Sequence, residues 1–553
     1  MRRAVVAAVV GVIASATSVS AQPAERTAVV LFVRGASMPQ LLDVPELGSL
    51  ATRGGVALMN GRSGVGNEIR NLLHGDPDRS TRVQIGNARG VDDLAFVVGK
   101  IAFIQEDPTL LMVISTSPSA ATAADGDELG TVIAAWGDPA ELLEAQGKPH
   151  ALTSDSTRRV GVVATVDPAA TVAAWLDLPY DDGAPIERTG EPAPLELYDR
   201  YLQQRRLAVP TAAVSWGVVT LFGLVATLTL ALRRRLSPRT LGAAGTLAFS
   251  LPWLALGLLL VGHLPSLTVG SVVPFLVVVV VAGVVLTRGV AGRRGVLVAL
   301  AACGGVILAI LGIEAALGWP AAVTPLAGGG QLDGGRFFGM PNVEIGMVLG
   351  SAMFVAHRVR VRRGVMLLLA CALVAGSPWT GSNLGAAIAL FAAAGLWLAV
   401  RRRRSWWLTV VVAGAITAGG TAAILLLHRY LTDRPTHVSA FLADDTSIQG
   451  ILERLTDRLA IGFDQLADTP AALIPVVGTL VLLVVVLRPP PAIALNFEGH
   501  DAWRDAVLVL LLGSIVAYLA NDTGAAAVGF GFGFALAGLL GVSLAAARGK
   551  MTR

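Results

Sequence analysis

Three short polar segments interrupt the apolar carboxyl-terminal part of the sequence, and they carry the residues best suited to chemistry. They lie within residues 331–346, 428–441 and 521–524. Guanidinium groups bind carboxylates and phosphates through paired hydrogen bonds, and imidazole exchanges protons near pH 7. The candidate catalytic residues are therefore Arg336, His437 and Asp522, and the candidate substrate-binding residues are Asn342, Glu344, Arg429, Asp433, Arg434 and Asn521.

These side chains allow two arrangements. The three arginines pair either with Asp433 and Asp522 or with a phosphate head group, in which case His437 acts as general acid or base. Asp522 has a further interpretation, because a carboxylate between two apolar runs also caps the helix that follows. Ionisable groups at membrane depth are rare and are usually functional, so the segments predict one polar site.

The composition indicates a membrane protein. Of 553 residues, 54% are hydrophobic and 15% are charged, which is more apolar than a soluble protein of this length requires. The formal net charge of +4 comes from arginines that flank apolar runs, which indicates membrane orientation and not nucleic-acid binding. Cys303 and Cys371 lie in apolar runs without metal-ligand spacing. We predict neither a metal nor another cofactor.

The predicted fold class is an α-helical polytopic membrane protein, with about 11 spans and an amino-terminal extracytoplasmic α/β domain. Residues 1–21 resemble a signal peptide, with an uncleaved anchor as the alternative. The α/β domain covers residues 22–205. The membrane domain covers residues 206–553 and includes an outer loop at 428–469.

The predicted membrane helices alternate in the charge that follows them. Every odd-numbered helix ends in arginines, which places those ends and the carboxyl terminus in the cytoplasm and the three polar segments outside. The predicted helices are 210–232, 241–262, 270–287, 295–317, 341–356, 364–377, 382–400, 406–427, 470–487, 506–520 and 525–546.

The amino-terminal domain alternates strand-type and helix-type runs, which predicts a parallel sheet with helical crossovers. Asp167 is predicted to cap its helix, with Pro168 in the first turn. The predicted strands are 27–33, 56–60, 110–115, 131–136 and 160–164, and the predicted helices are 44–53, 92–103 and 167–176.

The segments VVLFVRG (29–35), PELGSLATRGGVALMNGRSG (45–64) and VGVVATVDPAATVAAWLDLP (160–179) make this domain resemble the alkaline phosphatase/sulfatase superfamily. Active members carry a metal-binding Asp after the first strand, where this chain has Arg34, and a nucleophile near Ser63. Their later Asp-His pair corresponds to Ser115-Thr116 here. The resemblance therefore implies a degenerate, non-catalytic domain, because a two-metal site needs those ligands.

The segments RFFGMPN (336–342), PTHVSAF (435–441) and NDTG (521–524) resemble signatures of a family of bacterial polytopic membrane proteins of uncharacterised function. That family shares the layout of signal peptide, phosphatase-like domain and many membrane helices. Its usual members read closer to RF-G-x-x-N and NDSG. The many helices and single long outer loop are also somewhat similar to O-antigen ligases and polymerases.

Three functions fit these expectations. The first is a plasma-membrane protein of the bacterial cell envelope that handles a lipid-linked saccharide or phosphate, with a transferase-type activity at the outer leaflet. The second is a transporter or flippase, with helix breaks near Pro341, Pro378 and Gly524. The third is a non-catalytic envelope scaffold. The expected partners are membrane lipids, and a lipid-linked glycan or other envelope proteins.

Overall fold

The computed structural model describes residues 26–34, 36–60, 83–88, 109–116, 130–137, 141–142, 147–180, 183–207, 237–327, 331–332, 338–432, 473–490, 497–521 and 524–546, and residues 94, 97, 98, 438, 456, 460 and 494 singly. The predicted signal peptide and the first predicted membrane helix lie outside these residues. The contacts divide the chain into two compact units. Unit 1 comprises Met1–Arg205, Gln331–Phe338 and Asp433–Thr436, and unit 2 comprises Arg206–Gly330, Gly339–Thr432 and His437–Arg553.

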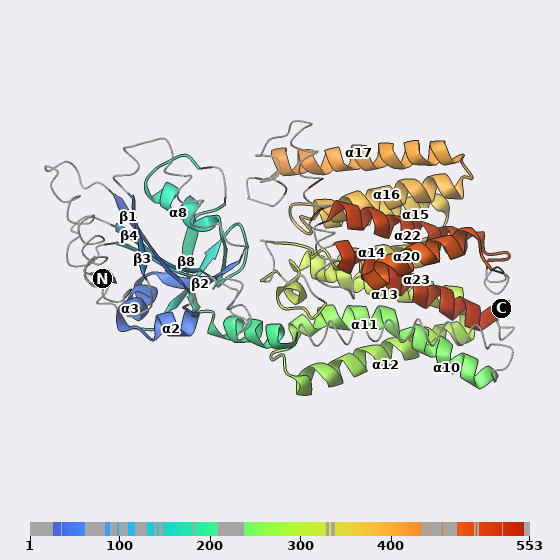
Figure 1. The fold of residues 1–553 in the computed structure, drawn as a ribbon, viewed down its shortest axis with the longest axis horizontal. Helices are drawn as coiled ribbons and strands as arrows, with labels where there is room; N and C mark the ends of the chain where they lie inside the picture. Colours follow the sequence, from blue (N-terminus) through green and yellow to red (C-terminus); the bar gives the residue numbers. More distant parts are fainter. Residues whose placement is uncertain are drawn as a thin grey trace. The chain divides into compact units, whose positions relative to one another are not determined.

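Unit 1 contains an eight-stranded sheet within its described residues (Figure 1). The strand order is β3-β1-β4-β5-β2-β6-β8, and β7 pairs with β2. The strands are β1 (Thr27–Arg34), β2 (Gly55–Asn60), β3 (Val83–Ala88), β4 (Thr109–Thr116), β5 (Gly130–Gly137), β6 (His150–Ser154), β7 (Val162–Ala164) and β8 (Ile186–Pro192).

The sheet is mixed, so the expectation of a parallel sheet is correct only in part, and β2 pairs in parallel with β6 and β7. Strand β1 pairs in parallel with β3 and β4, whereas β5 runs antiparallel to both β4 and β2, and β8 runs antiparallel to β6. Continuous apolar runs predict strands that are covered on both faces, but they carry no information about strand direction. All five predicted strands are present, and β3, β6 and β8 are additional.

The helix α8 (Asp167–Trp175) covers the sheet and begins with a buried carboxylate. Asp167 was predicted to cap this helix, but it is the first helical residue. The residue at the cap position is Val166. The oxygens of Asp167 accept hydrogen bonds from Ser154 Oγ at 2.5 Å and Ser156 Oγ at 2.6 Å, and from the backbone N–H of Ala164 at 2.6 Å and Ala184 at 3.1 Å. Burial raises the pKa of this carboxyl, and the four hydrogen bonds act in the opposite direction.

Unit 2 is helical, and its helices run roughly along one direction in Figure 1. Six of them are long and apolar enough to cross a membrane: α12, α13, α16, α17, α22 and α23. The helices are α10 (Pro238–Ala248), α11 (Ser250–Leu260), α12 (Val269–Arg294), α13 (Val296–Ala316), α14 (Glu344–Ala356), α15 (Val361–Gly376), α16 (Leu384–Arg401), α17 (Trp406–Tyr430), α20 (Leu473–Leu487), α22 (Asp501–Ala520) and α23 (Gly524–Ala546).

The structure supports a multi-pass membrane protein with an α/β domain, but it does not support the count of about 11 spans. Each predicted membrane helix after the first coincides with described helical residues. The second one is divided into α10 and α11. Helix α14 has only 13 residues, and α15 and α20 are also shorter than 18 residues. Apolar composition thus located the helices, whereas length separates the six long ones from the rest.

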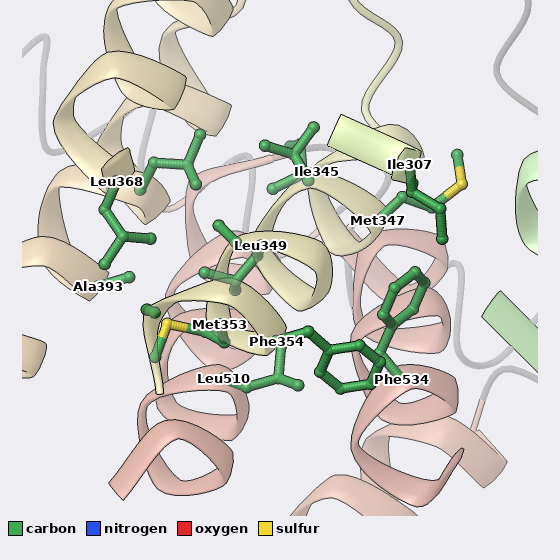
Figure 2. Packing of buried hydrophobic residues seen from close by; sticks show 14 of the residues in the cluster. Ile307, Ile345, Met347, Leu349, Met353, Phe354, Leu368, Ala393, Leu510 and Phe534 are labelled. Carbon is green, nitrogen blue, oxygen red and sulfur yellow. The ribbon is translucent and has the colours of Figure 1, made fainter. Parts of the chain in front are cut away.

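Helix α14 is the centre of the helical unit. All of its residues except Val355 are buried. Figure 2 shows side chains of α14 packed among residues of α13, α15, α16, α22 and α23, including Phe354 against Phe534, whose ring centroids lie 5.4 Å apart. Glycines allow the closest approaches, because a Cβ at Gly346 would lie 2.2 Å from the carbonyl oxygen of Ala527 on α23.

We expect the substitution Asp167→Ala to lower the free energy of unfolding of unit 1 by about 3 kcal/mol or more, because it leaves buried donors without an acceptor. Urea unfolding of the full-length protein, followed by the fluorescence of unit 1 tryptophans, measures the loss. The control is Glu141→Ala, which removes an exposed ion pair with Arg53 and should change the free energy by less than about 1 kcal/mol. Equal effects of the two substitutions would contradict a structural role for the buried carboxylate.

Candidate functional site

The structure describes four of the nine predicted site residues. Arg336, His437, Asp522, Asp433 and Arg434 lie outside the described residues. The four described residues are Asn342, Glu344, Arg429 and Asn521. All of them except Arg429 are buried. The site is therefore built from these positions and from the helix ends that hold them.

The helices of unit 2 alternate in direction, so that the starts of some helices and the ends of others share one end of the unit. Helices α12, α14, α16, α20 and α23 begin at this end, and α11, α13, α15, α17 and α22 finish there. We call it the polar end. The opposite end carries the arginines in the last turns of α12 and those that follow α14, α16 and α20, and we call it the arginine end.

Asn383 joins two segments of backbone at the polar end. Its Oδ1 accepts the N–H of Ala386 at 2.9 Å, which caps the start of α16. Its Nδ2 donates to the carbonyl oxygen of Met340 at 3.0 Å and to Oδ1 of Asn342 at 3.2 Å. One buried amide therefore holds the non-helical segment before α14 against the first turn of α16.

The same segment is fixed by backbone contacts. The N–H of Met340 donates to the carbonyl oxygen of Gly381 at 2.7 Å. Gly339 has φ +98°, and a Cβ there would lie 2.0 Å from the Gly381 oxygen. Only glycine fits both the left-handed conformation and this approach.

Asn521 completes a group that we call the asparagine cluster: Asn342, Asn383 and Asn521. A Cβ on Gly385 would lie 2.2 Å from Oδ1 of Asn521, so this side chain lies on the first turn of α16. Its Nδ2 donates to the carbonyl oxygen of Ala517 at 2.8 Å. Glu344, two residues after Asn342, opens α14 and is fully buried. The structure thus brings together three of the predicted binding residues and adds Asn383.

The electrostatics of this cluster come from helix ends. Helices α14 and α16 begin at the cluster, and α23 begins close by because Gly346 packs on Ala527. Unsatisfied N–H groups give the first turn of a helix a partial positive charge, which stabilises the carboxylate of Glu344 in the first turn of α14. The amide side chains beside this carboxylate favour a hydroxyl-rich group.

Two further polar contacts lie at the polar end. His428 Nε2 is 2.9 Å from the carbonyl oxygen of Gly376 and joins the ends of α17 and α15. His263 Nε2 is 2.5 Å from Oε1 of Glu314, whose Oε2 accepts the N–H of Ala321 at 3.1 Å. The Glu314 side chain is only 4% exposed, so this pair closes the end of α13 against the loop after α11.

Arg429 does not join the asparagine cluster. It is exposed at the end of α17, and its guanidinium lies 5.7 Å from the ring centroid of Tyr430. Among the described residues it makes no hydrogen bond with Asn342, Asn383 or Asn521. The neighbouring His428, which the sequence did not single out, is the buried residue of this pair.

The arginine end contains a second polar group. Arg401 Nη1 lies 2.9 Å from Oδ2 of the buried Asp505, which joins α16 to α22. The ring of His357 packs edge-on to Trp503 with centroids 5.2 Å apart. Sequence reasoning missed this pairing because the arginines there were attributed to membrane orientation alone.

Within the part of the chain that the structure describes, no group of three or more His, Cys, Asp or Glu side chains is placed to hold a metal ion. No protein-family model matches the chain, and neither does any curated protein or solved structure with which it was compared.

We expect Asn383→Ala to lower the free energy of unfolding by about 3 kcal/mol, because it removes the cap of α16 and two buried hydrogen bonds. Asn383→Asp keeps the capping oxygen but turns an acceptor toward the Met340 and Asn342 oxygens, so it should also destabilise the protein. Thermal unfolding in detergent measures both. The matched control is Ser405→Ala, at the start of α17, where the side chain makes no capping hydrogen bond. Melting temperatures equal to wild type in both Asn383 variants would contradict the structural role of this amide.

Proposed function

We propose that this chain is a multi-pass plasma-membrane protein that handles a lipid-linked saccharide or phosphate at the polar end of its helical unit. The observation that carries the proposal is the convergence of Asn342, Asn383, Asn521 and Glu344 at helix ends inside an apolar bundle. Buried polar groups are expensive in such surroundings. Their gathering at one point therefore favours a binding role.

The exposed faces of the bundle support membrane insertion. Helices α12 and α17 bury few of their residues and expose apolar ones, such as Val278 and Val410. Helix α17 has 25 residues, or about 37 Å at 1.5 Å per residue, with Trp406 and Trp407 at one end and Tyr430 at the other. Tryptophan and tyrosine favour the two bilayer interfaces. In our proposal the solvent that surrounds this unit is therefore lipid.

The arginine end faces the cytoplasm in this proposal, because cytoplasmic loops are rich in Lys and Arg. The polar end then faces outward, as does the domain that precedes the helices. Helix α14, with 13 residues, covers about 20 Å of a hydrocarbon layer that is roughly 30 Å thick. The asparagine cluster at its start consequently lies below the outer surface, at a depth where the head group of a lipid-linked substrate can enter from the bilayer.

The predicted catalytic residues lie near described polar residues in the sequence. Asp522 follows Asn521 directly, so their Cα atoms are about 3.8 Å apart. Arg336 precedes Asn342 by six residues and His437 follows the anchored His428 by nine. We assign charge balance on a phosphate to Arg336 and acid–base transfer to His437. Asp522 orients one of these two groups through a charge-assisted hydrogen bond.

In this proposal the α/β domain has a binding role and catalyses no reaction. The phosphatase-like resemblance implies metal ligands at two positions that hold Arg34 and Ser115 in this chain. Ser115 Oγ instead donates to the carbonyl oxygen of Ala36 at 2.5 Å. A hydroxyl committed to the backbone at the end of β4 supports a structural role there.

A transporter or flippase is the second candidate, and one observation favours it. The segments before α14 and α16 are non-helical yet buried, with Met340 at 1% and Asn383 at 0% exposure. Non-helical backbone inside a membrane bundle is typical of transport sites, where it lines a path for the substrate.

The substitutions Arg336→Ala, His437→Ala and Asp522→Ala should each lower the rate of lipid-linked saccharide or phosphate turnover by about 100-fold or more. The measurement is mass spectrometry of lipid-linked saccharides and of envelope polymers in cells that carry each variant as the sole copy. Insertion is checked by the amount of full-length protein in the membrane fraction. Asp501→Ala, which removes an exposed pair with Arg403 at the arginine end, is the control and should match wild type.

Two outcomes separate the candidates. If purified wild-type protein moves a fluorescent polyprenyl-phosphate saccharide across proteoliposomes without altering it, the second candidate is correct. If envelope composition and flux are both unchanged in all three variants, the polar end handles no lipid-linked substrate and the proposal is wrong.

A further inference from the structure

The turn between β6 and β7 presents two consecutive arginines that the proposed function does not use. Arg159 Nε donates to Oε1 of Gln331 at 2.6 Å. The acceptor is almost completely buried, with 2% of its surface exposed. Both residues belong to unit 1, although 172 positions separate them in the sequence. A partly buried, charge-assisted hydrogen bond of this kind is stronger than one between neutral groups.

Arg158 contacts the other end of the same segment. Its guanidinium carbon lies 4.2 Å from the ring centroid of Phe338, well within the range of about 6 Å for a cation–π interaction. Leu332, next to Gln331, is also buried. The two neighbouring arginines therefore contact both ends of Gln331–Phe338.

The turn that carries the arginines has a strained backbone at Arg158 and is held by hydrogen bonds. Arg158 has φ +55°, a left-handed conformation that non-glycine residues rarely adopt. The conformation is held by Thr157 Oγ1, which donates to the carbonyl oxygen of Val162 at 2.6 Å, and by backbone hydrogen bonds from Arg158 to Ser154 and from Gly161 to Leu152. Strain that persists under such constraint is typical of positions with a specific task.

We infer that the Arg158–Arg159 turn is a docking site for the chain's own segment Gln331–Phe338, and that the α/β domain thereby fixes the polypeptide that leads into α14. The division between the units falls between Phe338 and Gly339, three residues before Asn342. Anchoring of the segment restricts the freedom of the chain immediately before the asparagine cluster. The inference assigns the α/β domain a positioning role that does not depend on any substrate.

The test is hydrogen–deuterium exchange of the full-length protein in detergent. In Arg159→Ala and Arg158→Ala we expect amides within residues 331–338 to exchange on the order of tenfold faster than in wild type, because local opening no longer breaks the anchoring contact. The peptide that covers β4 reports whether unit 1 remains folded. Arg53→Ala is the control, since Arg53 is an exposed arginine of the same unit paired with Glu141, and it should leave the segment unchanged.

Substitutions within the segment 331–338 show whether faster exchange results from loss of the contact or from misfolding of unit 1. Gln331→Ala and Phe338→Ala alter no residue of the sheet and should produce the same acceleration. In the double variant Arg159→Ala/Gln331→Ala the acceleration should equal that of either single variant, because both remove one hydrogen bond. Wild-type exchange in both segment-side variants, or fully additive effects in the double variant, would overturn the inference. Since the readout is exchange and not turnover, this result is independent of the proposed function.

Discussion

Buried helix ends impose the constraint on which the helical unit depends. The first N–H groups and last C=O groups of a helix have no partner within that helix, and in apolar surroundings water cannot supply one. Asn383 meets this requirement for α16 and at the same time holds the backbone at Met340. At the end of α15, His428 lies within hydrogen-bond distance of the Gly376 oxygen, and Glu314 accepts the N–H of Ala321 beyond α13. The polar side chains at the polar end are thus needed for folding, because they supply partners for the backbone groups of the helix ends.

The same constraint explains why a binding site can arise there. Groups that satisfy backbone atoms are held rigidly by their own hydrogen bonds, and rigid polar groups bind a ligand with little further loss of entropy. Helix α14 is short and almost wholly buried, so its first turn lies inside the bundle. The close contact of Gly346 with α23 and of Gly385 with Asn521 makes this arrangement possible, since a side chain at either glycine would separate the helices.

Polar side chains described in the α/β domain hold its own fold together. Its carboxylate at Asp167 is consumed by four hydrogen bonds, and Ser115 is committed to the backbone of Ala36. The Arg158–Arg159 turn of this domain contacts Gln331 and Phe338.

The sequence by itself determined the class of the protein, the position of each described membrane-type helix and five strands of the sheet, because apolar periodicity and length are local properties. It also pointed to Asn342, Glu344 and Asn521 as polar residues next to apolar runs. Only the tertiary structure decided that β5 and β8 run antiparallel, that Asn383 joins Asn342 across 41 residues, and that Arg429 lies exposed beside a buried His428. Strand direction and hydrogen-bond partners depend on contacts between distant parts of the chain, and no local pattern of hydropathy or charge encodes them.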